Sequence, residues 1–409
     1  MFIIETVVTA KVKLLPTPEQ CLLLDDTLDA IRAGLNHASK VAFENNYLSA
    51  FKKLQALVYS DLRAIYGLKS QMACNVCSIV AGSYASMKSN NERALAIYKK
   101  PKLQYSYNRD YSFLKAGLVS IGTTKDRIKL PFVKTGLEHY FDGSWEYGTA
   151  TLVKKKGKYY LHVSVKKELE ICSDADIKNV VGADVGMNYL ITAINGDDKM
   201  LFIGGRHIKS KKAQFQRVRK SLQMRQTPSS RKRLRLIGNR ENRWQQDINH
   251  KVAKALVEFA GKDSLIVLED LKGIRMSTER VKRKDRYYAV SWGYFDLRNK
   301  IEYKAKQNGI QTIAVDPKYT SQKCPKCGHT EKANRNKKLH TFACKSCGYT
   351  SNDDRIGAIN LRQSGIEFRH AVSTQASSCV EQGASATLRC NNTQLRQKVG
   401  GIYAARTTD

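Results

Sequence analysis

The 409-residue sequence contains no run of about 18 apolar residues, the length that a helix needs to cross a bilayer. It also contains no lipidation motif and no secretory signal. We therefore expect no membrane partner, and we do not expect the ten cysteines to form a disulfide framework. The chain is long enough to bury a large core, and its length predicts two or three domains.

Acidic residues are scarce. The chain has 37 Asp and Glu against 70 Lys and Arg, so its formal net charge is +33, which implies a polyanionic partner. Residues 205–240 contain no Asp or Glu. A solvated helix face normally carries acids between its basic residues, but here nothing within the segment relieves the repulsion between the positive charges. We expect this segment to contact nucleic-acid phosphates through Lys209, Lys211, Lys212, Arg217, Arg219, Lys220, Arg225, Arg231, Lys232, Arg233 and Arg235.

Four of the cysteines form two close pairs, Cys324 with Cys327 and Cys344 with Cys347. Two thiol pairs separated by a medium loop supply the four soft ligands of a tetrahedral zinc site, and a glycine after each pair suits a sharp turn around the metal. Incidental thiols and disulfides are poorer explanations, because the other cysteines are scattered. Cys74 and Cys77 have the same spacing but lie in an apolar run without a second pair, so we expect core thiols there.

A first apolar segment, residues 180–186, is typical of a buried strand and contains Asp184. A strand at 189–194 follows it. The dipeptide Asn195–Gly196 then predicts a two-residue hairpin turn, with a return strand at 200–203.

Two further carboxylates stand at comparable places. Residues 264–270 read as a second buried strand that contains Glu269, and residues 353–361 read as the opening of a helix that contains Asp354 beside Asp353. Two strand-borne carboxylates and one helix-borne carboxylate can converge to hold a pair of Mg²⁺ ions. Such ions activate water and stabilise the leaving oxygen in phosphodiester hydrolysis.

The N-terminal part reads as a strand, a group of helices and a return to strands. Alternating apolar residues predict a half-buried strand at 8–14, Thr17–Gln20 forms a capping box, and helical spacing continues to about Lys99. Strands at 146–153 and 159–165 are predicted to form a hairpin. Five tyrosines interleaved with basic residues could stack on bases or serve as ordinary strand aromatics; they are Tyr105, Tyr107, Tyr111, Tyr159 and Tyr160.

Downstream of the second buried strand, a helix is predicted to close at Asn308–Gly309 before a strand at 310–315. Trp292 and Phe295 near its start are expected to pack it against a sheet. His340 is expected to be a surface or packing residue, because four cysteines already complete a zinc site.

The motifs, taken in order, resemble the split RuvC nuclease of the TnpB family. They are Gly-Ala-Asp184-Val-Gly, Val-Leu-Glu269-Asp-Leu, Thr320-Ser-Gln-Lys-Cys-Pro-Lys-Cys-Gly and Asp354-Arg-Ile-Gly-Ala-Ile-Asn-Leu. TnpB proteins are transposon-encoded relatives of the miniature type V CRISPR nucleases. Family members commonly carry Asn where Ile356 stands here. The alignment nevertheless favours Asp354 as the metal ligand, and Asp353 would then cap the helix.

The resemblance implies a multidomain α/β fold. It consists of an RNase H-like (RuvC) nuclease core, an inserted zinc ribbon, and an N-terminal β-barrel wedge domain with a helical recognition insertion. The implied boundaries are 1–15 and 105–175 for the wedge domain, 16–104 for the recognition lobe, 176–319 and 350–364 for the nuclease, and 320–349 for the zinc ribbon. Residues 365–409 are rich in Ser, Thr, Gln, Asn and Ala, and are predicted to be a disordered tail.

The resemblance also implies an RNA-guided DNA endonuclease of the prokaryotic cytoplasm, associated with the nucleoid when bound to DNA. One protein monomer would use a transposon-end-derived guide RNA to pair with double-stranded target DNA next to a short flanking motif. Asp184, Glu269 and Asp354 would hold two Mg²⁺ ions, and the four cysteines would hold zinc. The alternatives are a miniature type V CRISPR effector and a nuclease-inactive RNA-guided repressor. A transposase in the strict sense is disfavoured, because no His–hydrophobe–His motif with a suitably placed tyrosine is apparent.

Overall fold

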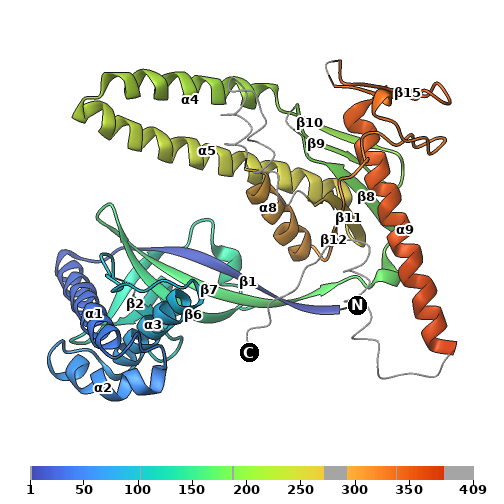
Figure 1. Cartoon of the computed structure of the whole chain (residues 1–409). Coiled ribbons are helices and arrows are strands. Elements are labelled where there is room, and N and C mark those ends of the chain that lie inside the picture. Colours follow the sequence, from blue (N-terminus) through green and yellow to red (C-terminus); the bar gives the residue numbers. More distant parts are fainter. Residues whose placement is uncertain (1, 102, 187, 271–292, 338, 382–409) are drawn as a thin grey trace. The chain divides into compact units, whose positions relative to one another are not determined.

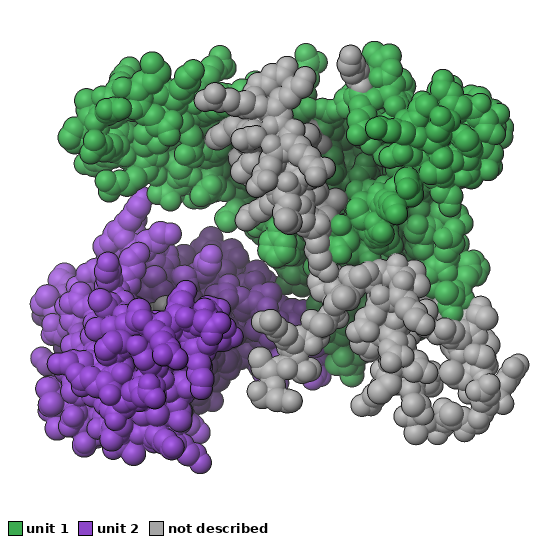
Figure 2. All heavy atoms as spheres, in the orientation of Figure 1, with its two compact units in different colours: residues 1–4, 169–409 green, residues 5–168 purple. Residues whose placement is uncertain are grey.

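A computed structural model describes residues 2–101, 103–186, 188–270, 293–337 and 339–381 of the chain. The chain divides into two compact units, residues 5–168 and residues 1–4 with 169–409 (Figure 2). Separate clusters of buried apolar side chains stabilise the two units.

The unit of residues 5–168 is built on a seven-stranded sheet with the order β2-β6-β7-β1-β5-β4-β3 (Figure 1). The Tyr111 hydroxyl on β3 donates to the Gly148 carbonyl on β6 over 2.7 Å, so the two ends of the sheet approach each other and the barrel is nearly closed. The strands are β1 Phe2–Leu14, β2 Leu103–Tyr105, β3 Tyr111–Leu114, β4 Leu118–Gly122, β5 Arg127–Val133, β6 Glu146–Lys155 and β7 Lys158–Ile171.

Three helices lie between β1 and β2: α1 Pro18–Glu44, α2 Phe51–Ala64 and α3 Ser70–Ser89. The predicted capping box at the start of α1 is confirmed, because the Thr17 hydroxyl accepts from the Gln20 N–H and the Gln20 side chain accepts from the Thr17 N–H. Cys77 is fully buried in α3, as expected for a core thiol, whereas Cys74 is only partly buried. The predicted hairpin of β6 and β7 is also present. Its turn residues Lys156 and Gly157 both have positive φ, which suits a tight two-residue connection.

The other unit contains a five-stranded sheet with the order β10-β9-β8-β11-β12. Its strands are β8 Asn179–Asp184, β9 Tyr189–Ile194, β10 Met200–Gly204, β11 Ser264–Glu269 and β12 Gln311–Val315. The strands β8, β11 and β12 run parallel, while β9 and β10 form an antiparallel hairpin on β8. The predicted turn of this hairpin is too short: residues 195–199 form the loop, because the Asn195 side chain accepts from the N–H groups of Asp197 and Lys199.

Helices cover both faces of this sheet (Figure 1). On one face, α5 Pro228–Ala260 and α8 Tyr294–Gln307 bury Leu256 and Leu297 against strand residues such as Ile266. On the other face, α9 Asp353–Glu381 buries Leu361 and Phe368. The helix α4 Arg206–Arg225 packs along α5 as a helical hairpin. The predicted helix end at 308–309 and strand at 310–315 are confirmed by α8 and β12.

Glycines allow α9 to lie directly on the sheet. A Cβ atom on Gly182 in β8 would stand only 2.1 Å from the Ala358 carbonyl oxygen of α9. One on Gly365 in α9 would stand 2.4 Å from a Val267 methyl group on β11. The sheet and α9 therefore touch backbone to backbone, and the first turn of α9 reaches the ends of the strands.

Two further predictions about this unit are wrong. The tail was expected to be disordered from residue 365, but α9 continues to Glu381, since Phe368 packs into the apolar cluster under the sheet. Residues 382–409 lie outside the described residues. Phe295 was expected to pack against the sheet, but it is 76% exposed at the start of α8; Trp292 lies outside the described residues. None of the helices in the described ranges is apolar enough over a sufficient length to span a bilayer.

Candidate metal-binding active site

Asp184 and Glu269 are the last residues of β8 and β11, which are parallel neighbours. The strand register pairs Ala183 with Leu268, so the residues that follow lie at the same level. Because parallel strands point in one direction, both carboxylates stand at the same edge of the sheet, where open α/β sheets commonly bind ligands.

The first turn of α9 begins at this edge. The Asn352 side chain accepts from the N–H groups of Asp354 (3.0 Å) and Arg355 (3.2 Å), so Asn352 caps the helix. The expectation that Asp353 is the cap is therefore wrong. Asp353 is the first helical residue, is fully buried, and forms an ion pair with Arg335 at 2.8 Å.

Asp354 is the next residue of α9, and Gly357 one turn later lies against Asp184. A Cβ atom on Gly357 would stand 3.1 Å from the Asp184 carboxylate oxygen. The absence of a side chain at Gly357 thus lets the helix approach the strand-borne carboxylate. The structure places all three sequence-predicted acidic residues around one point, the end of β8.

The charges of these groups repel one another. Burial, followed by the charges of Glu269 and Asp354, raises the pKa of Asp184 well above its ordinary value. Burial also raises the pKa of Glu269, although the hydrogen bond from Thr320 lowers it in part. Burial and then the neighbouring charge of Asp353 raise the pKa of Asp354. A bound cation would relieve this repulsion.

Two carboxylate oxygens in the cluster, Oδ1 of Asp353 and Oδ2 of Asp354, are buried and have no hydrogen-bond partner in the described part of the chain. A buried charged oxygen without a partner is costly and rare in folded proteins. A divalent cation would provide the missing partner, and carboxylate oxygens are the ligands that Mg²⁺ prefers. The residues present therefore fit a metal site.

Other side chains hold these acids in place, and sequence reasoning missed them. The Thr320 hydroxyl donates to Glu269 Oε1 at 2.5 Å, and the Asn360 side chain donates to the Thr320 carbonyl at 2.6 Å. Asp270, the neighbour of Glu269, forms an ion pair with Arg298 instead. These long-range contacts could not be found from local patterns, although Thr320 and Asn360 both stand in the motifs that carry the resemblance.

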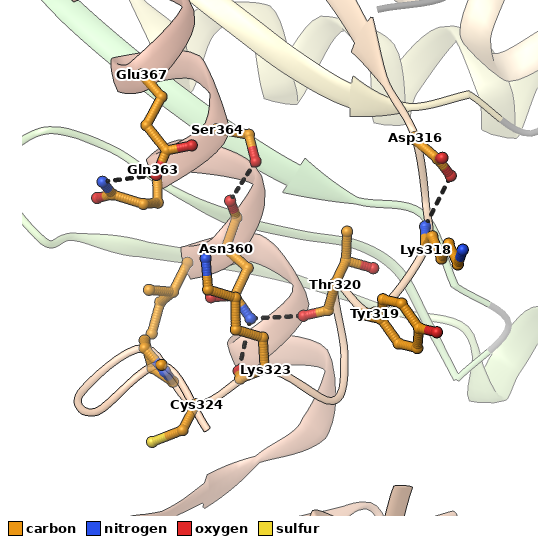
Figure 3. A pocket seen from close by; sticks show the side chains of 13 residues that line it. Asp316, Lys318, Tyr319, Thr320, Lys323, Cys324, Asn360, Gln363, Ser364 and Glu367 are labelled. Atoms are coloured by element: carbon orange, nitrogen blue, oxygen red, sulfur yellow. Dashed lines mark hydrogen bonds between the residues drawn. The ribbon is translucent and has the colours of Figure 1, made fainter. Parts of the chain in front are cut away.

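A cavity of about 450 Å³ is lined in part by Thr320 and Asn360 (Figure 3). The segment after β12 forms one wall with Lys318, Tyr319 and Thr320, and α9 forms the other with Asn360 and Gln363. Tyr319 is 51% exposed and Lys318 lies over its ring. The Thr320 side chain, which bonds Glu269, therefore lies between the cavity and this carboxylate.

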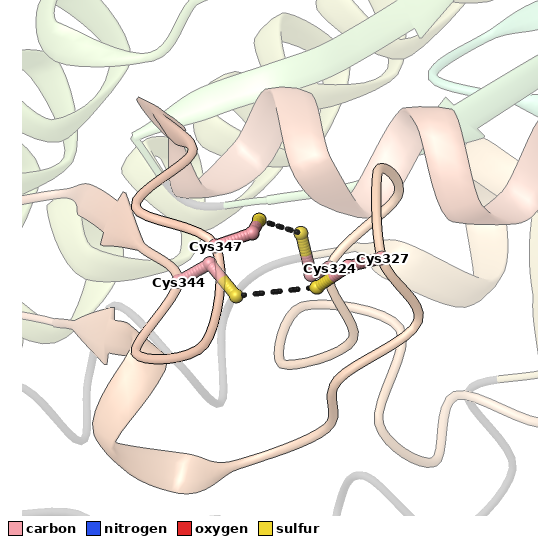
Figure 4. Close-up of side chains that lie close together, drawn as sticks. All are labelled: Cys324, Cys327, Cys344 and Cys347. Atoms are coloured by element: carbon pink, nitrogen blue, oxygen red, sulfur yellow. Dashed lines mark hydrogen bonds between the residues drawn. The ribbon is translucent and has the colours of Figure 1, made fainter.

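The four predicted zinc ligands meet in one cluster (Figure 4). The Sγ atoms of Cys324 and Cys347 are 3.7 Å apart, and those of Cys327 and Cys344 are 3.5 Å apart. A tetrahedral zinc ion with Zn–S bonds of about 2.3 Å would separate its sulfurs by about 3.8 Å, so the residues fit zinc.

The backbone around the cysteines repeats one geometry twice. Gly328 and Gly348 have positive φ, and their N–H groups donate to the carbonyls of the first cysteine of each pair. This confirms the predicted glycine turns. A small sheet of β13 Arg335–Asn336, β14 Thr341–Ala343 and β15 Thr350–Asn352 completes the module and leads into α9.

The predicted phosphate-binding residues lie on α4 and the first half of α5. Seven of the eleven are exposed: Arg217, Lys220, Arg225, Arg231, Lys232, Arg233 and Arg235. Lys209 and Lys211 are partly buried. Two predictions are corrected: Lys212 is buried, which lowers its pKa to about 8, and Arg219 forms an ion pair with the buried Glu241 of α5 at 2.6 Å. Glu241 of α5 thus neutralises one positive charge of α4, although residues 205–240 themselves contain no acid.

The suggested base-stacking tyrosines are mostly core residues. Tyr105, Tyr111 and Tyr159 are at most 2% exposed, so they cannot stack on a base without unpacking the barrel. Tyr107 and Tyr160 are partly exposed.

Comparisons with known proteins can now be set beside this geometry. A family model described as "Probable transposase" matches residues 161–278, and one described as "Cas12f1-like, TNB domain" matches residues 294–361. The chain is 29% identical over 300 residues to the CRISPR-associated endodeoxyribonuclease Cas12f1 of Syntrophomonas palmitatica, covering 69% of this chain and 58% of that protein. It is 29% identical over 272 residues to the putative RNA-guided DNA endonuclease InsQ of Escherichia coli, covering 62% of this chain and 65% of that protein.

A TnpB-like protein of Methanocaldococcus jannaschii is 33% identical over 123 residues, covering 30% of this chain and 43% of that protein. Among solved structures, a Cas12f1–sgRNA–target DNA complex matches with a TM-score of 0.60 at 13% identity, covering 88% of this chain and 99% of that one. The fold is thus similar to that of Cas12f1, and the sequence matches fall among transposase-like and CRISPR-associated proteins. The relatives include TnpB-like proteins as well as Cas12f nucleases. It spans about three fifths of the length of the Cas12f1 relatives that it matches.

Proposed function

We propose that this protein is an RNA-guided DNA endonuclease of the TnpB type, with a RuvC nuclease centre formed by Asp184, Glu269 and Asp354. The observation that carries the proposal is the convergence of these three acids at the carboxyl ends of β8 and β11 and the start of α9. Relatives of the chain are named as endodeoxyribonucleases and as an RNA-guided DNA endonuclease, which supports the same chemistry.

The acids would hold two Mg²⁺ ions, which activate water and stabilise the leaving oxygen of a phosphodiester. Asp184 lies centrally, since it feels the charges of both Glu269 and Asp354. Thr320 fixes the Glu269 carboxylate by its hydrogen bond, and the Asn352 cap fixes the first turn of α9 on which Asp354 stands. The chain's own residues therefore preorganise the ligands before any metal binds.

The exposed basic residues of α4 and α5 would bind the sugar–phosphate backbones of guide RNA and target DNA. A net charge of +33 gives such a protein a large electrostatic affinity for nucleic acid without sequence preference. Base pairing by the guide would then supply the sequence specificity, while the protein reads a short flanking motif. One protein per guide RNA, transcribed from a transposon end, completes the proposal.

A miniature type V CRISPR effector is the second candidate, because Cas12f1 proteins are among the relatives. The chemistry would be identical, and the genomic neighbourhood separates the two. Transposon ends beside the gene support the TnpB type, whereas a CRISPR repeat array supports the effector. A nuclease-inactive repressor is disfavoured, because all three acids are present.

The test is to purify the protein from cells that carry its genomic locus and to sequence the RNA that copurifies. We expect one abundant RNA whose end can be replaced by a chosen guide, and Mg²⁺-dependent cleavage of plasmids that match that guide. Absence of a discrete RNA, or cleavage that ignores the guide, would contradict the proposal.

A further inference from the structure

His340 lies beside the candidate active site and not beside the zinc-binding cysteines. His340, Asp353 and Asp354 each offer one ligand atom, and these atoms lie within 4.8 Å of one another. Nδ1 of His340 lies 3.5 Å from Oδ1 of Asp353. The histidine precedes β14 of the cysteine-bearing module, while the two aspartates open α9, so the cluster joins this module to the helix that follows it.

We propose that His340 supplies a nitrogen ligand to a metal ion at Asp354, with Asp353 as a further oxygen ligand, so that this position prefers a transition-metal ion such as Mn²⁺ over Mg²⁺. The inference deepens the proposed nuclease function and rests on it, because Asp354 is shared. The position at Asp184 and Glu269 has oxygen ligands only.

The first support is the pair of carboxylate oxygens that nothing else satisfies. Asp353 is completely buried and Asp354 is 8% exposed, yet Oδ1 of the first and Oδ2 of the second have no hydrogen-bond partner in the described ranges. Arg335 occupies only the other oxygen of Asp353. Each aspartate therefore keeps one buried oxygen for a cation.

The second support is that His340 is held in position. Its Nε2 contacts the side-chain amide of Asn188, whose oxygen in turn accepts from Lys209. Its carbonyl accepts from the Asn352 side chain, and its backbone lies in the left-handed region at φ 54°. A non-glycine residue in that region is strained and is maintained by its surroundings, so the imidazole is presented by a fixed backbone.

Charge favours a cation there. Four carboxylates, Asp184, Glu269, Asp353 and Asp354, face two cationic side chains, Arg335 and Lys209. When all are ionised, four negative and two positive charges leave an excess of two negative charges. Mg²⁺ favours oxygen ligands, whereas imidazole suits transition-metal ions, so a mixed nitrogen and oxygen set shifts the preference.

The test uses full-length zinc-loaded protein freed of Mg²⁺, without RNA or DNA. Mn²⁺ is the probe, because it binds thiolates weakly and leaves the zinc in place. Binding of Mn²⁺ is followed by electron paramagnetic resonance, and binding of Mg²⁺ by calorimetry. We expect His340→Ala to weaken Mn²⁺ binding at Asp354 by about tenfold or more and Mg²⁺ binding by less than about twofold.

His329→Ala is the matched control, because His329 belongs to the same module and its imidazole contacts Glu331 and not the acidic cluster at the start of α9 in the described part of the chain. It should bind both ions as the wild type does. In the wild type, pulsed resonance should detect coupling of Mn²⁺ to imidazole nitrogen, and His340→Ala should lose it. Absence of this coupling in the wild type would be decisive even if His340→Ala fails to fold.

Absence of nitrogen coupling in the wild type, unchanged Mn²⁺ affinity in folded His340→Ala, or equal losses for both ions would overturn the inference. These outcomes are independent of cleavage. A protein that shows the coupling but never cuts guided DNA would contradict the proposed function and leave the metal preference standing.

Discussion

Four acidic side chains meet at the end of β8, and their neighbours distinguish their roles. Asp353 and Asp354 each have one buried oxygen without a hydrogen-bond partner among the described residues, but only Asp353 forms an ion pair with Arg335. Asp354 instead acts on Asp184, which α9 approaches closely at Gly357. Glu269 is likewise distinguished from Asp270, whose carboxylate is bound by Arg298. Adjacent residues of one chemical type thus serve different purposes.

Replacing each helix-borne aspartate by asparagine tests this assignment. Asp354→Asn should abolish guided cleavage while the protein keeps its stability. Asp353→Asn should lower the free energy of unfolding by about 2 kcal/mol or more, because it breaks a buried ion pair with Arg335, and should retain the larger share of Mg²⁺-dependent cleavage. Urea unfolding and plasmid cleavage with one guide measure both. Loss of cleavage in a stable Asp353→Asn protein, with Asp354→Asn active, would reverse the assignment.

The order of the two aspartates shows what sequence could and could not provide. The motifs correctly indicated that a strand–strand–helix set of carboxylates exists and predicted the strands that carry it. They could not indicate that Asn352, the preceding residue, caps α9, since Asn and Asp cap helices about equally well. Nor could they reveal Arg335, which pairs with Asp353 across 18 residues of chain.

At the scale of elements, α9 and the cysteine-bearing module depend on each other. The module ends in β15, the helix starts at the next residue, and Arg335 of β13 binds the first residue of the helix. Zinc that stabilises the module should therefore also stabilise the acidic cluster.

Metal analysis tests this dependence. The protein should contain about one zinc per chain, and Cys344→Ser should lose it, because the variant lacks one of the four sulfur ligands. The free energy of zinc binding stabilises the folded module, so the module should also unfold more easily in the variant. Guided cleavage should fall together with the zinc content. Cys21→Ser, which changes a partly buried free cysteine of the other unit, should keep both. A folded, active protein without zinc would show that the cysteines have another role.

The close contact of α9 with β8 makes a second prediction at this scale. Gly182→Ala should destabilise the protein by about 1–3 kcal/mol, because the new methyl group would collide with the Ala358 carbonyl. Gly204→Ala in β10 should change the stability little, because nothing lies within 4 Å of the position of its Cβ. Thermal unfolding of the two variants compares them. Equal stabilities would mean that the helix is not seated on the strand as described.

Elements were predicted better than their ends and surroundings. Apolar runs predicted β8, β11 and β12, since buried parallel strands have a strong compositional signal. The end of α9 was missed, because the Ser, Thr, Gln, Asn and Ala content of residues 365–409 read as disorder until the packing of Phe368 against the sheet is known. Phe295 was predicted to pack against the sheet but is exposed. Its apolar character alone could not show whether the start of the helix faces the sheet or the solvent.

At the scale of the whole molecule, the excess of positive charge is the feature from which we infer nucleic-acid binding. Part of it is neutralised internally: Arg219 pairs with Glu241, and Lys212 is buried. The exposed remainder on α4 and α5 is available to phosphates. Sequence could count these charges but could not separate the two groups, because Glu241 lies on the neighbouring helix.

Salt dependence measures how many of these charges bind nucleic acid. Changing Arg231, Lys232, Arg233 and Arg235 to Gln should reduce the slope of log affinity against log salt by up to about three, since each phosphate contact contributes about 0.7–0.9. Changing Lys251 and Lys254, which pair with Asp247 and Glu258 on α5, should reduce it by less per residue. An unchanged slope in the fourfold variant would place the nucleic-acid surface elsewhere.

Replacement of the central carboxylate is the most direct test of the whole account. Asp184→Ala removes the ligand that both other acids face, so guided cleavage of target DNA in Mg²⁺ should fall by orders of magnitude. Binding of the guide RNA should persist, because it depends on phosphate contacts made elsewhere. Both are measured on one purified preparation, by gel assay of plasmid cleavage and by RNA titration. Near-normal cleavage by Asp184→Ala with intact RNA binding would contradict the account.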